Sequence, residues 1–430
     1  MAGIDLFFEI IGDLTLKKIA ILSLDPTVGG GVLHSLLAAH KFCRQYFEPT
    51  VFFLDFDPRK SANFRNLSFR SSVSSKKLFG MDCRAIGARW AFWEPGHYAW
   101  TLKDWDRELS GFHYFFVSSG TGIAAHPLAL LDKKFVAWIA TPISGDREGK
   151  PFLTNPIRMI TDAVAWPKML DLEREILSKA SFLLAMSSYA KKEFERIVQG
   201  ANPPMEICGY PLDQDFCGEI DLKHDSSRKV CVSIGRFADP RKDALTLLRA
   251  WELVSKRVPE AVLELVGTPP ADRICRKFKT LIDEGKIRFV GTVDQDKKLE
   301  ILSRSSLAII SSLQEGLGIA GLEAASFGLP IVSTDCGGPS DYVLDGLTGF
   351  VVPVGDYSAM ADRIVQLLKD KKLSAKMGSK AKVLTGYFYS QEMIYNKFAM
   401  AFSYVWPELS SLFPLDRNKK VKKAQQISAE

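Results

Sequence analysis

The sequence lacks the usual marks of a secreted or membrane-spanning chain. It contains no run of about eighteen uncharged apolar residues, the length that an ordinary transmembrane helix requires. Its opening stretch is partly apolar, but Asp5, Glu9 and Asp13 interrupt it and no basic residue precedes it, unlike a secretory signal. We therefore expect a cytoplasmic protein.

The cysteine pattern indicates neither a disulfide scaffold nor a metal site. The seven cysteines are odd in number and widely spaced along the chain. They form neither a CxxC pair nor a Cys/His cluster with metal-ligand spacing. This pattern argues against a disulfide scaffold and favours reduced, mostly buried thiols, and we expect no metal site.

The composition also lacks any strong bias. Of the 430 residues, 47% are hydrophobic and 25% are charged, which is the mix of an ordinary globular enzyme. The length exceeds that of one compact domain and predicts two or three.

The N-terminal half opens as a doubly wound α/β domain does. Lys17–Leu24 is a short apolar run typical of a buried strand, and Gly29, Gly30 and Gly31 follow it. Val32–Phe42 then carries apolar residues at helical spacing. A strand, a glycine turn and a helix in this order predict a parallel sheet with helices on both faces.

Strands and helices alternate through both halves of the chain, which indicates two parallel sheets. In the first half we expect strands at Thr50–Phe56, Tyr114–Val117, Phe135–Ile139 and Phe182–Met186, and helices at Leu172–Lys179 and Tyr189–Val198. In the second half we expect strands at Lys229–Ile234, Val262–Val266, Ile287–Val290, Ala308–Ser311 and Pro330–Ser333, and helices at Asp243–Val258, Gly321–Phe327 and Ser358–Lys369.

The segment Asn202–Phe216 is rich in Pro and Gly and is interpreted as the connection between domains. We predict an N-terminal domain over residues 1–205 and a C-terminal domain over residues 206–384. Aromatic helices over residues 385–412 are expected to pack back on the N-terminal domain. The basic tail, residues 413–430, is expected to be disordered.

Two carboxylates flank a glycine-containing turn in the string SSLQEGLGIAGLE. Seven residues separate Glu315 from Glu323, and Gly316 and Gly318 between them allow the backbone to approach a ligand closely. A helix expected from Gly321 would offer free amide groups to a phosphate. The carboxylates could accept hydrogen bonds from sugar and ribose hydroxyls. The purely structural alternative is a loop glutamate and a carboxylate in the first turn of a helix.

Three basic residues, Arg236, Arg241 and Lys242, follow the strand that is expected to end at Ile234. Fixed cations at the end of a strand could clamp a diphosphate. Two aspartates lie alongside them, so a solvated basic turn is the alternative.

The second half contains, in order, SIGRFADPRKD, LELVG, IRFVGTV, SSLQEGLGIAGLEAASFGLPIVSTDCGG and DGLTGFVVPVGD. These pieces, over about Lys229–Lys382, resemble family 4 of the retaining GT-B glycosyltransferases, also called glycosyl transferases group 1. The specific part of the resemblance is the pair of glutamates seven residues apart. The N-terminal half is similar more loosely, through its glycine turn and the Leu172–Ser188 region.

The resemblance implies the GT-B fold, in which two Rossmann-like, doubly wound parallel-sheet domains face a central cleft. The N-terminal domain would then receive the acceptor, and the C-terminal domain would bind a nucleotide-sugar donor.

The resemblance also implies a role for each matching residue. Arg236 and Lys242 match the pair that neutralises the donor diphosphate. The basic residue usually lies one place earlier, at Arg241, so which of these two neighbours reaches phosphate stays open. Glu315 matches the carboxylate beside the donor sugar, and Glu323 matches the one that holds the ribose hydroxyls. The other expected donor contacts lie in the phosphate turn, the nucleobase pocket and the opposing N-terminal loop: Gly29, Gly30, Gly31, Gly235, Gly291, Val293, Gly316, Leu317, Gly318 and Ile319.

The chain departs from the family pattern at two places. The family often has a histidine after a strand like Phe135–Ile139, whereas this stretch reads AWIATPISGD. His126 lies nearby and is our candidate for a sugar or acceptor contact, although a lone histidine is more often structural. Asp341 stands where a glutamate is frequent.

The expected function is a retaining glycosyltransferase that moves a sugar from a UDP- or GDP-linked donor to an acceptor hydroxyl in glycan, polysaccharide or glycoconjugate synthesis. No carboxylate suggests itself as a covalent nucleophile, and the resemblance fits a route in which the leaving phosphate helps to deprotonate the acceptor. It also implies that fixed cations replace a metal, and that no cofactor is needed besides the donor substrate.

Three other functions remain open. A GT-B nucleotide-sugar epimerase would need additional acid–base groups. A non-catalytic nucleotide-sugar-binding scaffold would not need the intact set of Arg236, Lys242, Glu315 and Glu323. A nicotinamide-dependent dehydrogenase is disfavoured because the N-terminal glycines lack the GxGxxG spacing.

The positive charge of the chain is unevenly placed. Its formal net charge is +6, and the segment Arg59–Arg89 alone carries eight basic residues against Asp82. Apolar residues are interleaved with these cations, so the segment could collect a lipid-linked acceptor at the anionic inner face of a membrane. A solvated loop region and an acidic soluble acceptor, either glycan or protein, are the alternatives. No nucleic-acid-binding motif accompanies the segment.

Overall fold

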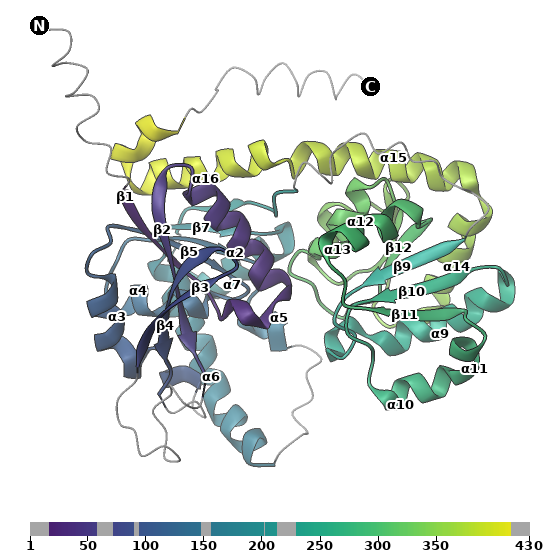
Figure 1. Ribbon diagram of the computed structural model, residues 1–430, viewed down its shortest axis with the longest axis horizontal. Helices are drawn as coiled ribbons and strands as arrows, with labels where there is room; N and C mark the ends of the chain where they lie inside the picture. The colour runs from purple at the N-terminus through teal and green to yellow at the C-terminus, as the bar shows by residue number, and fades with distance from the viewer. Residues whose placement is uncertain are drawn as a thin grey trace, which may run out of the picture.

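The protein was analysed as a computed structural model that describes residues 17–57, 72–89, 94–147, 156–201, 203–212 and 229–413. It has two domains, each built around one sheet (Figure 1). The part of the basic segment from Arg59 to Arg70 lies outside the described residues, as does the tail from residue 414 onward.

The N-terminal sheet has eight strands in the order β3-β4-β2-β1-β5-β6-β7-β8, and β3 is antiparallel to β4 while the other pairs are parallel. The strands are β1 Lys17–Leu22, β2 Phe47–Asp55, β3 Val73–Leu78, β4 Met81–Gly87, β5 Tyr114–Ser119, β6 Val136–Ile139, β7 Phe182–Ala185 and β8 Met205–Ile207. The helices are α2 Gly30–Cys43, α3 Leu102–Leu109, α4 His126–Leu130, α5 Ile143–Arg147, α6 Pro156–Lys179 and α7 Ser188–Val198.

The central strands of this sheet are buried on both faces. Ile19 and Ile21 of β1 pack into one core cluster, whereas Ala20 and Leu22 pack into another on the opposite face. Side chains alternate between the faces of a strand, so a continuous apolar run needs cover on both sides. The uninterrupted apolar character of its last four residues, IAIL, follows from the central place of β1 in a doubly wound sheet.

The C-terminal sheet has six parallel strands in the order β11-β10-β9-β12-β13-β14. The strands are β9 Val230–Ile234, β10 Val262–Val266, β11 Ile287–Gly291, β12 Leu307–Ile310, β13 Ile331–Thr334 and β14 Gly349–Val352. The helices are α9 Ala244–Arg257, α10 Asp272–Cys275, α11 Lys279–Asp283, α12 Gln295–Arg304, α13 Ile319–Ser326 and α14 Tyr357–Lys369.

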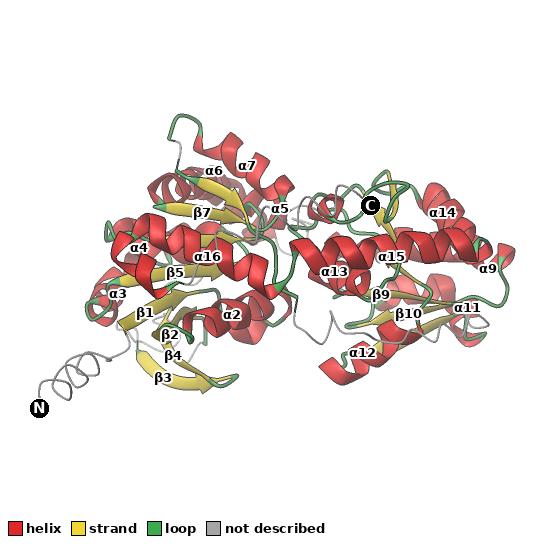
Figure 2. Cartoon of the chain, turned by 90° about the horizontal axis from the view of Figure 1, so that it is seen from above, coloured by secondary structure: helices red, strands yellow, loops and turns green. Residues whose placement is uncertain are grey.

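The last two long helices cross between the domains. Helix α15, Lys371–Phe388, lies along the C-terminal domain, and α16, Gln391–Val405, lies on the N-terminal domain (Figures 1 and 2). Phe398 of α16 packs against Trp138 of β6 with ring centroids 4.8 Å apart. Tyr395 OH donates a hydrogen bond to the carbonyl of Ala38 in α2. Helix α16 therefore completes the hydrophobic core of the N-terminal domain.

Several expected boundaries differ from the structure. β8 belongs to the N-terminal sheet, so this sheet continues past residue 205 into the segment that we interpreted as a connection. The helix expected at Leu172–Lys179 is the last third of α6, which begins at Pro156. Phe413, which we assigned to the tail, is buried and stacks on Phe42. A short strand such as β8 and an aromatic residue such as Phe413 have no distinctive sequence pattern around them. Their positions follow from tertiary packing and could not be predicted from the sequence.

Candidate functional site

The two domains meet at the carboxyl ends of their strands. Gln314, which follows β12, donates from Nε2 to Thr141 Oγ1, which follows β6, at 2.8 Å. Ser187, which follows β7, donates from Oγ to the carbonyl of Gly316 at 2.5 Å. In doubly wound sheets ligands bind at this edge, so the junction is the place to look for a site.

The basic turn after β9 is held in a fixed shape. Asp239 accepts a hydrogen bond from the Arg241 N–H, and a short 3-10 helix, η6, runs from Pro240 to Lys242. Asp243 then adopts a left-handed conformation with φ of 40° and caps α9 by accepting from Thr246 N–H. The turn therefore presents consecutive side chains in different directions.

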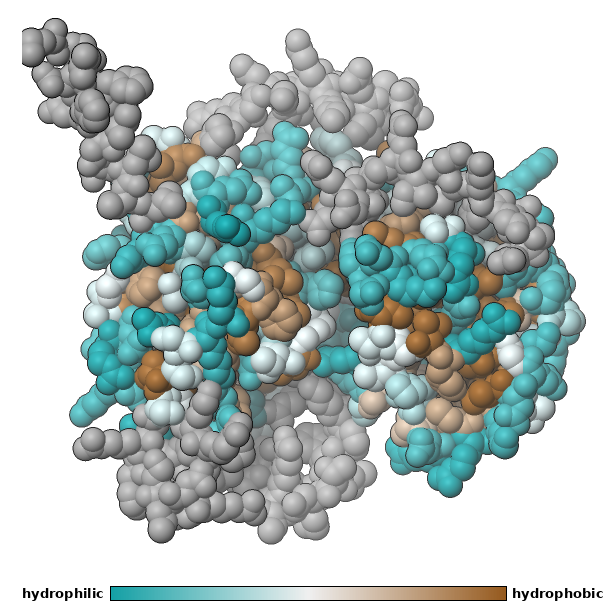
Figure 3. All heavy atoms as spheres, in the orientation of Figure 1, coloured by the Kyte–Doolittle hydropathy of each residue, from teal (hydrophilic) through white to brown (hydrophobic). Residues whose placement is uncertain are grey.

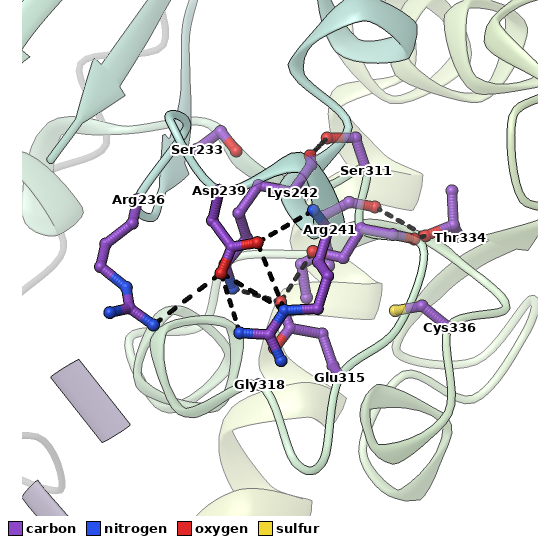
Figure 4. Close-up of polar contacts among 12 residues, drawn as sticks. Ser233, Arg236, Asp239, Arg241, Lys242, Ser311, Glu315, Gly318, Thr334 and Cys336 are labelled. Carbon is purple, nitrogen blue, oxygen red and sulfur yellow. Dashed lines mark hydrogen bonds and ion pairs between the residues drawn. The ribbon is translucent and has the colours of Figure 1, made fainter. Parts of the chain in front are cut away.

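Lys242 and Glu315 form the centre of the site. Lys242 Nζ lies 2.5 Å from Glu315 Oε1, and Ser312 Oγ donates to the same oxygen at 2.7 Å (Figure 4). Burial alone would raise the pKa of Glu315, but Lys242, the Ser312 hydrogen bond and nearby Arg241 together hold it below its ordinary value. Glu315 is therefore a half-buried, ionised carboxylate.

The structure separates the two neighbouring cations that the sequence left undecided. Arg241 Nη2 pairs with Asp239 at 2.8 Å, whereas Lys242 reaches Glu315. Arg236 is more open: 48% of its side chain is exposed, and its nearest recorded carboxylate, on Asp239, lies 3.9 Å away. Lys242 is thus directed at Glu315 and Arg236 is the most exposed of the three cations, while the contact of either with a diphosphate stays a prediction.

The glycine turn ends where α13 begins. Gly318 is the N-cap residue and has φ of 77°, a left-handed conformation that suits glycine. The Tyr342 hydroxyl donates to the Gly318 carbonyl at 2.7 Å. The helix starts at Ile319 rather than at Gly321 as expected, because glycine caps it there. The free amide groups of the first turn therefore follow Gly318 directly.

Glu323 has a partner that the sequence did not reveal. Lys298 of α12 lies 2.7 Å from Glu323 Oε1, and the side chains are 11% and 4% exposed. The pair joins two helices, so Lys298 holds one carboxylate oxygen of Glu323. The expected contact of Glu323 with ribose hydroxyls stays a prediction that would use the other oxygen.

The N-terminal glycines face the donor side of the junction. A Cβ atom on Gly30 would lie 3.9 Å from the Arg236 guanidinium carbon, and one on Gly31 would lie 3.9 Å from the Ile319 side chain. Gly29 has φ of 71° and open space beside it. The structure therefore brings this loop to within contact distance of the basic turn and the start of α13.

The remaining candidates have different environments. Gly291 ends β11 with φ of 82°, and Val293 is half-buried against the core. Gly235 packs against the Lys242 side chain, which a Cβ atom would meet at 3.5 Å. Leu317 is buried at 3% exposure, so its side chain belongs to the core and only its backbone can face a ligand.

His126 lies inside the N-terminal domain. It is 3% exposed, and its ring packs edge-on against Tyr98 at 6.0 Å. Burial is the main cause that lowers the pKa of His126 to about 4, so the ring is neutral. This is the environment of a structural histidine, and contact with a sugar or an acceptor remains a prediction.

Sequence reasoning missed several residues at the junction. Thr141 occupies the stretch that lacks the family's histidine, and it bonds to Gln314 instead. Glu173 of α6 is fully buried and accepts from the Ile143 N–H at 2.8 Å. The absence of the family's histidine was the one feature of the sequence that could have drawn attention to Thr141. No feature of the sequence around Glu173 indicates its place at the junction.

Comparisons with known proteins agree with this geometry. Residues 219–383 match the model of the family described as Glycosyl transferases group 1. N-acetyl-alpha-D-glucosaminyl L-malate synthase of Bacillus anthracis is 33% identical over 157 residues, which cover 36% of this chain and 40% of that protein. Alpha-D-kanosaminyltransferase of Streptomyces kanamyceticus is 25% identical over 313 residues, which cover 69% of this chain and 79% of that protein.

Solved structures show the same fold at low identity. Sucrose-phosphate synthase from Thermosynechococcus elongatus superposes with a TM-score of 0.70 at 17% identity, over 91% of this chain and 100% of that one. Anabaena HepE, solved with UDP and glucose, superposes with a TM-score of 0.65 at 16% identity, over 90% and 99%. Two Rossmann-like domains that meet at their strand ends give the chain the GT-B fold. Its C-terminal domain is similar to the glycosyl transferases group 1 over residues 219–383.

Proposed function

We propose that the protein transfers a sugar from a UDP- or GDP-linked donor to an acceptor hydroxyl with retention of configuration, in glycan or glycoconjugate synthesis. The observation that carries this proposal is the half-buried Lys242–Glu315 pair beside the Gly318 turn. The pair places one cation and one carboxylate next to the free amides of α13. These are the groups that a diphosphate and a sugar hydroxyl require.

The cations would act on the leaving group. As the bond from the anomeric carbon to the diphosphate oxygen breaks, its electron pair goes to that oxygen. Lys242, Arg236 and the α13 amides would stabilise the growing negative charge. An ammonium has three donors, so Lys242 can keep its bond to Glu315 and still reach a phosphate oxygen. Glu315 thereby holds the lysine in place and offers its second oxygen to the sugar.

Retention follows in this proposal from a route on one face of the sugar. The acceptor oxygen would form the new bond on the face that the diphosphate leaves, and its proton would pass to the departing phosphate oxygen. Fixed cations make that oxygen a good leaving group without consuming the proton. Nuclear magnetic resonance of the product tests this directly, since an inverted anomeric centre would contradict it.

The primary experiment identifies the donor. A thermal-shift panel of UDP-, GDP- and ADP-sugars should single out one nucleotide, and product analysis with that donor should show transfer to an acceptor hydroxyl. Conversion of the donor to an epimer without an acceptor would instead indicate an epimerase. Tight binding with no turnover, across a panel of acceptors, would indicate a scaffold.

The same cations predict independence from added metal. Because Arg236 and Lys242 supply positive charge at the diphosphate, turnover should persist in excess chelator. A loss of more than about tenfold that magnesium restores would contradict this part of the proposal.

We further propose that the acceptor is presented at an anionic membrane surface. The described helices include none that is both long and apolar enough to cross a bilayer. On the face shown in Figure 3 both domains mix hydrophilic and apolar side chains. GDP-mannose-dependent alpha-(1-6)-phosphatidylinositol monomannoside mannosyltransferase of Mycolicibacterium smegmatis, whose name includes a lipid acceptor, is 32% identical over 222 residues.

The β3–β4 hairpin is the described part of the basic segment that could touch such a surface. Its turn exposes Phe79, which has φ of 50° and is 56% exposed, and exposed Lys77 lies two residues before it. A bulky residue in a left-handed conformation is uncommon and often marks function. Lys76 differs, because it pairs with buried Asp55 at 2.7 Å.

Vesicle co-sedimentation tests the membrane proposal. The double variant Lys77→Gln/Phe79→Ser should bind anionic vesicles less than wild type at low salt, since each basic residue near the surface contributes about 1 kcal/mol. The matched control is Arg107→Gln, another exposed cation of the same domain. Equal sedimentation of all three proteins, or none by wild type, would leave an acidic soluble acceptor as the better interpretation.

A further inference from the structure

Helix α7 of the N-terminal domain contacts the donor-side turn through its first residues. Ser187, the N-cap residue, accepts a hydrogen bond from Ala190 N–H at 3.1 Å and donates to the carbonyl of Gly316 at 2.5 Å. Its hydroxyl therefore serves its own helix and the other domain at once. Gly316 lies directly after Glu315, so the contact is made to the turn that carries the central carboxylate.

Asp341 contacts the next residue of the same helix. It ends the 3-10 helix η8, Gly338–Asp341, and its Oδ2 accepts from Ser188 N–H at 2.8 Å. The Ser188 hydroxyl donates to Oδ1 of the same carboxylate. A carboxylate at the N-terminus of an 11-residue helix satisfies a free amide and meets the positive end of the helix dipole. The two domains thus share one helix cap.

The two contacts converge on one piece of backbone. Glu315 N–H donates to the carbonyl of Cys336 at 2.7 Å, and Gly338 N–H donates to the carbonyl of Glu315 at 2.9 Å. Cys336 and Gly338, which shortly precede Asp341, are therefore hydrogen-bonded to the N–H and to the carbonyl of Glu315, respectively. A Cβ atom on Gly338 would lie only 2.1 Å from the Gly316 carbonyl oxygen, so the segments are in close contact.

We propose that Ser188 and Asp341 are positioning residues that lock the two domains together and fix the turn carrying Glu315 for sugar transfer. This inference rests on the proposed transferase function and adds to it the element that couples domain arrangement to the site. The contact bears on Glu315 through backbone hydrogen bonds alone. Binding of the bare nucleotide, which the C-terminal domain would provide, should depend on it little.

The test compares wild type with four single variants and with the double variant Asp341→Asn/Ser188→Ala. Asp341→Asn removes the charge, Asp341→Glu keeps it, and Ser188→Ala removes the hydroxyl. Asp335→Asn is the matched control, because Asp335 is an exposed carboxylate in the same loop whose recorded hydrogen bond stays within it. The readouts are kcat and KM with the preferred donor, calorimetry with UDP and GDP, and the radius of gyration from small-angle X-ray scattering.

Asp341→Asn should lower kcat about tenfold, the effect of losing one charge-assisted hydrogen bond, and raise the radius of gyration. Its Kd for UDP or GDP should stay within about twofold of wild type. Asp341→Glu should recover most of the loss, and Asp335→Asn should match wild type. In the double variant Asp341→Asn/Ser188→Ala, the fall in kcat should be smaller than the product of the two single falls, because both residues form one contact.

Two results would overturn the inference. One is an Asp341→Asn variant with unchanged kcat and unchanged radius of gyration. The other is an equal loss of bare nucleotide affinity, which would place Asp341 at the ligand instead of at the domain contact. If wild type turned over no donor sugar, the transferase proposal would fail by itself. The scattering comparison would then still decide whether Asp341 holds the domains together.

Discussion

The glutamates of the candidate site, Glu315 and Glu323, differ from Glu173 of the N-terminal domain in how their charge is stabilised. In the C-terminal domain Glu315 and Glu323 each lie within 2.7 Å of a lysine ammonium. In the N-terminal domain Glu173 is fully buried with one backbone hydrogen bond, and its Oε2 has no partner among the described residues. Figure 4 shows how closely the donor-side charges are gathered.

Charge pairing decides which carboxylate is ionised. Burial raises the pKa of Glu173 to about 7, because only the Ile143 N–H opposes it. Burial acts on Glu315 too, but Lys242 reverses the shift. A site built to hold an anionic ligand needs fixed charges whose state does not vary near neutral pH. Glu173, which has only the Ile143 N–H beside it, can instead respond to pH.

Removing the lysine of the central pair should give the largest effect. Lys242→Met should lower turnover about a hundredfold, because losing a charge-assisted contact to a developing anion costs about 3 kcal/mol. Arg236→Ala should cost a similar factor while leaving the fold intact. Near-normal kcat/KM in both variants would place the diphosphate elsewhere.

A double variant sharpens this prediction. Lys242→Met leaves Glu315 buried and unpaired, so part of its cost is destabilisation rather than lost chemistry. Adding Glu315→Gln should restore thermal stability but not turnover. If the double variant were as unstable as Lys242→Met alone, the pair would not be the reason for the instability.

The contrast in pH response can be tested on Glu173. Its folded-state pKa is raised from 4.5 to about 7, so the folded state holds the proton more tightly than the unfolded state. Its contribution to stability is therefore present below about pH 4.5 and is lost as pH rises through about 7. The loss is about 3 kcal/mol. Denaturant unfolding at pH 4.5 and pH 8 should show this difference in wild type but not in Glu173→Gln.

The control for this measurement is Glu175→Gln. Glu175 lies two residues away on the same helix, and 47% of its side chain is exposed. Its replacement should leave the pH dependence of wild type unchanged. A Glu173→Gln variant with the wild-type slope would show that folding does not change the pKa of Glu173.

The two donor-side glutamates should differ in what they bind. Glu323→Gln should weaken UDP or GDP about tenfold, since Glu323 is expected to hold ribose. Glu315→Gln should leave bare nucleotide affinity nearly unchanged and lower sugar transfer. Isothermal calorimetry with the nucleotide alone separates them, and a larger loss in Glu315→Gln would reverse the two roles.

Arg241→Gln should have the smallest effect. Arg241 is occupied by Asp239 at 2.8 Å, so its removal costs the turn one partner and leaves Lys242 in place. We expect a fall in kcat/KM of about threefold, because the recorded partner of Arg241 is Asp239 and it acts on Glu315 only as a nearby charge. A fall as large as that of Lys242→Met would show that both cations reach the diphosphate.

The sequence by itself determined the alternation of strands and helices, the glycine turns and the two glutamates seven residues apart. These features are local: a buried parallel strand must be apolar throughout, and Gly318 suits a left-handed cap. The family resemblance in the second half rests on the same local strings. The match of the family model to residues 219–383 confirms it.

Only the tertiary structure decided which side chains meet. Arg241 and Lys242 are adjacent in sequence, but a 3-10 helix turns successive side chains by about 120°, so one faces Asp239 and the other Glu315. Lys298 reaches Glu323 across 25 positions, and Ser188 reaches Asp341 across 153. The spacing of residues in the sequence cannot predict such pairs, because they form only when distant segments pack against each other.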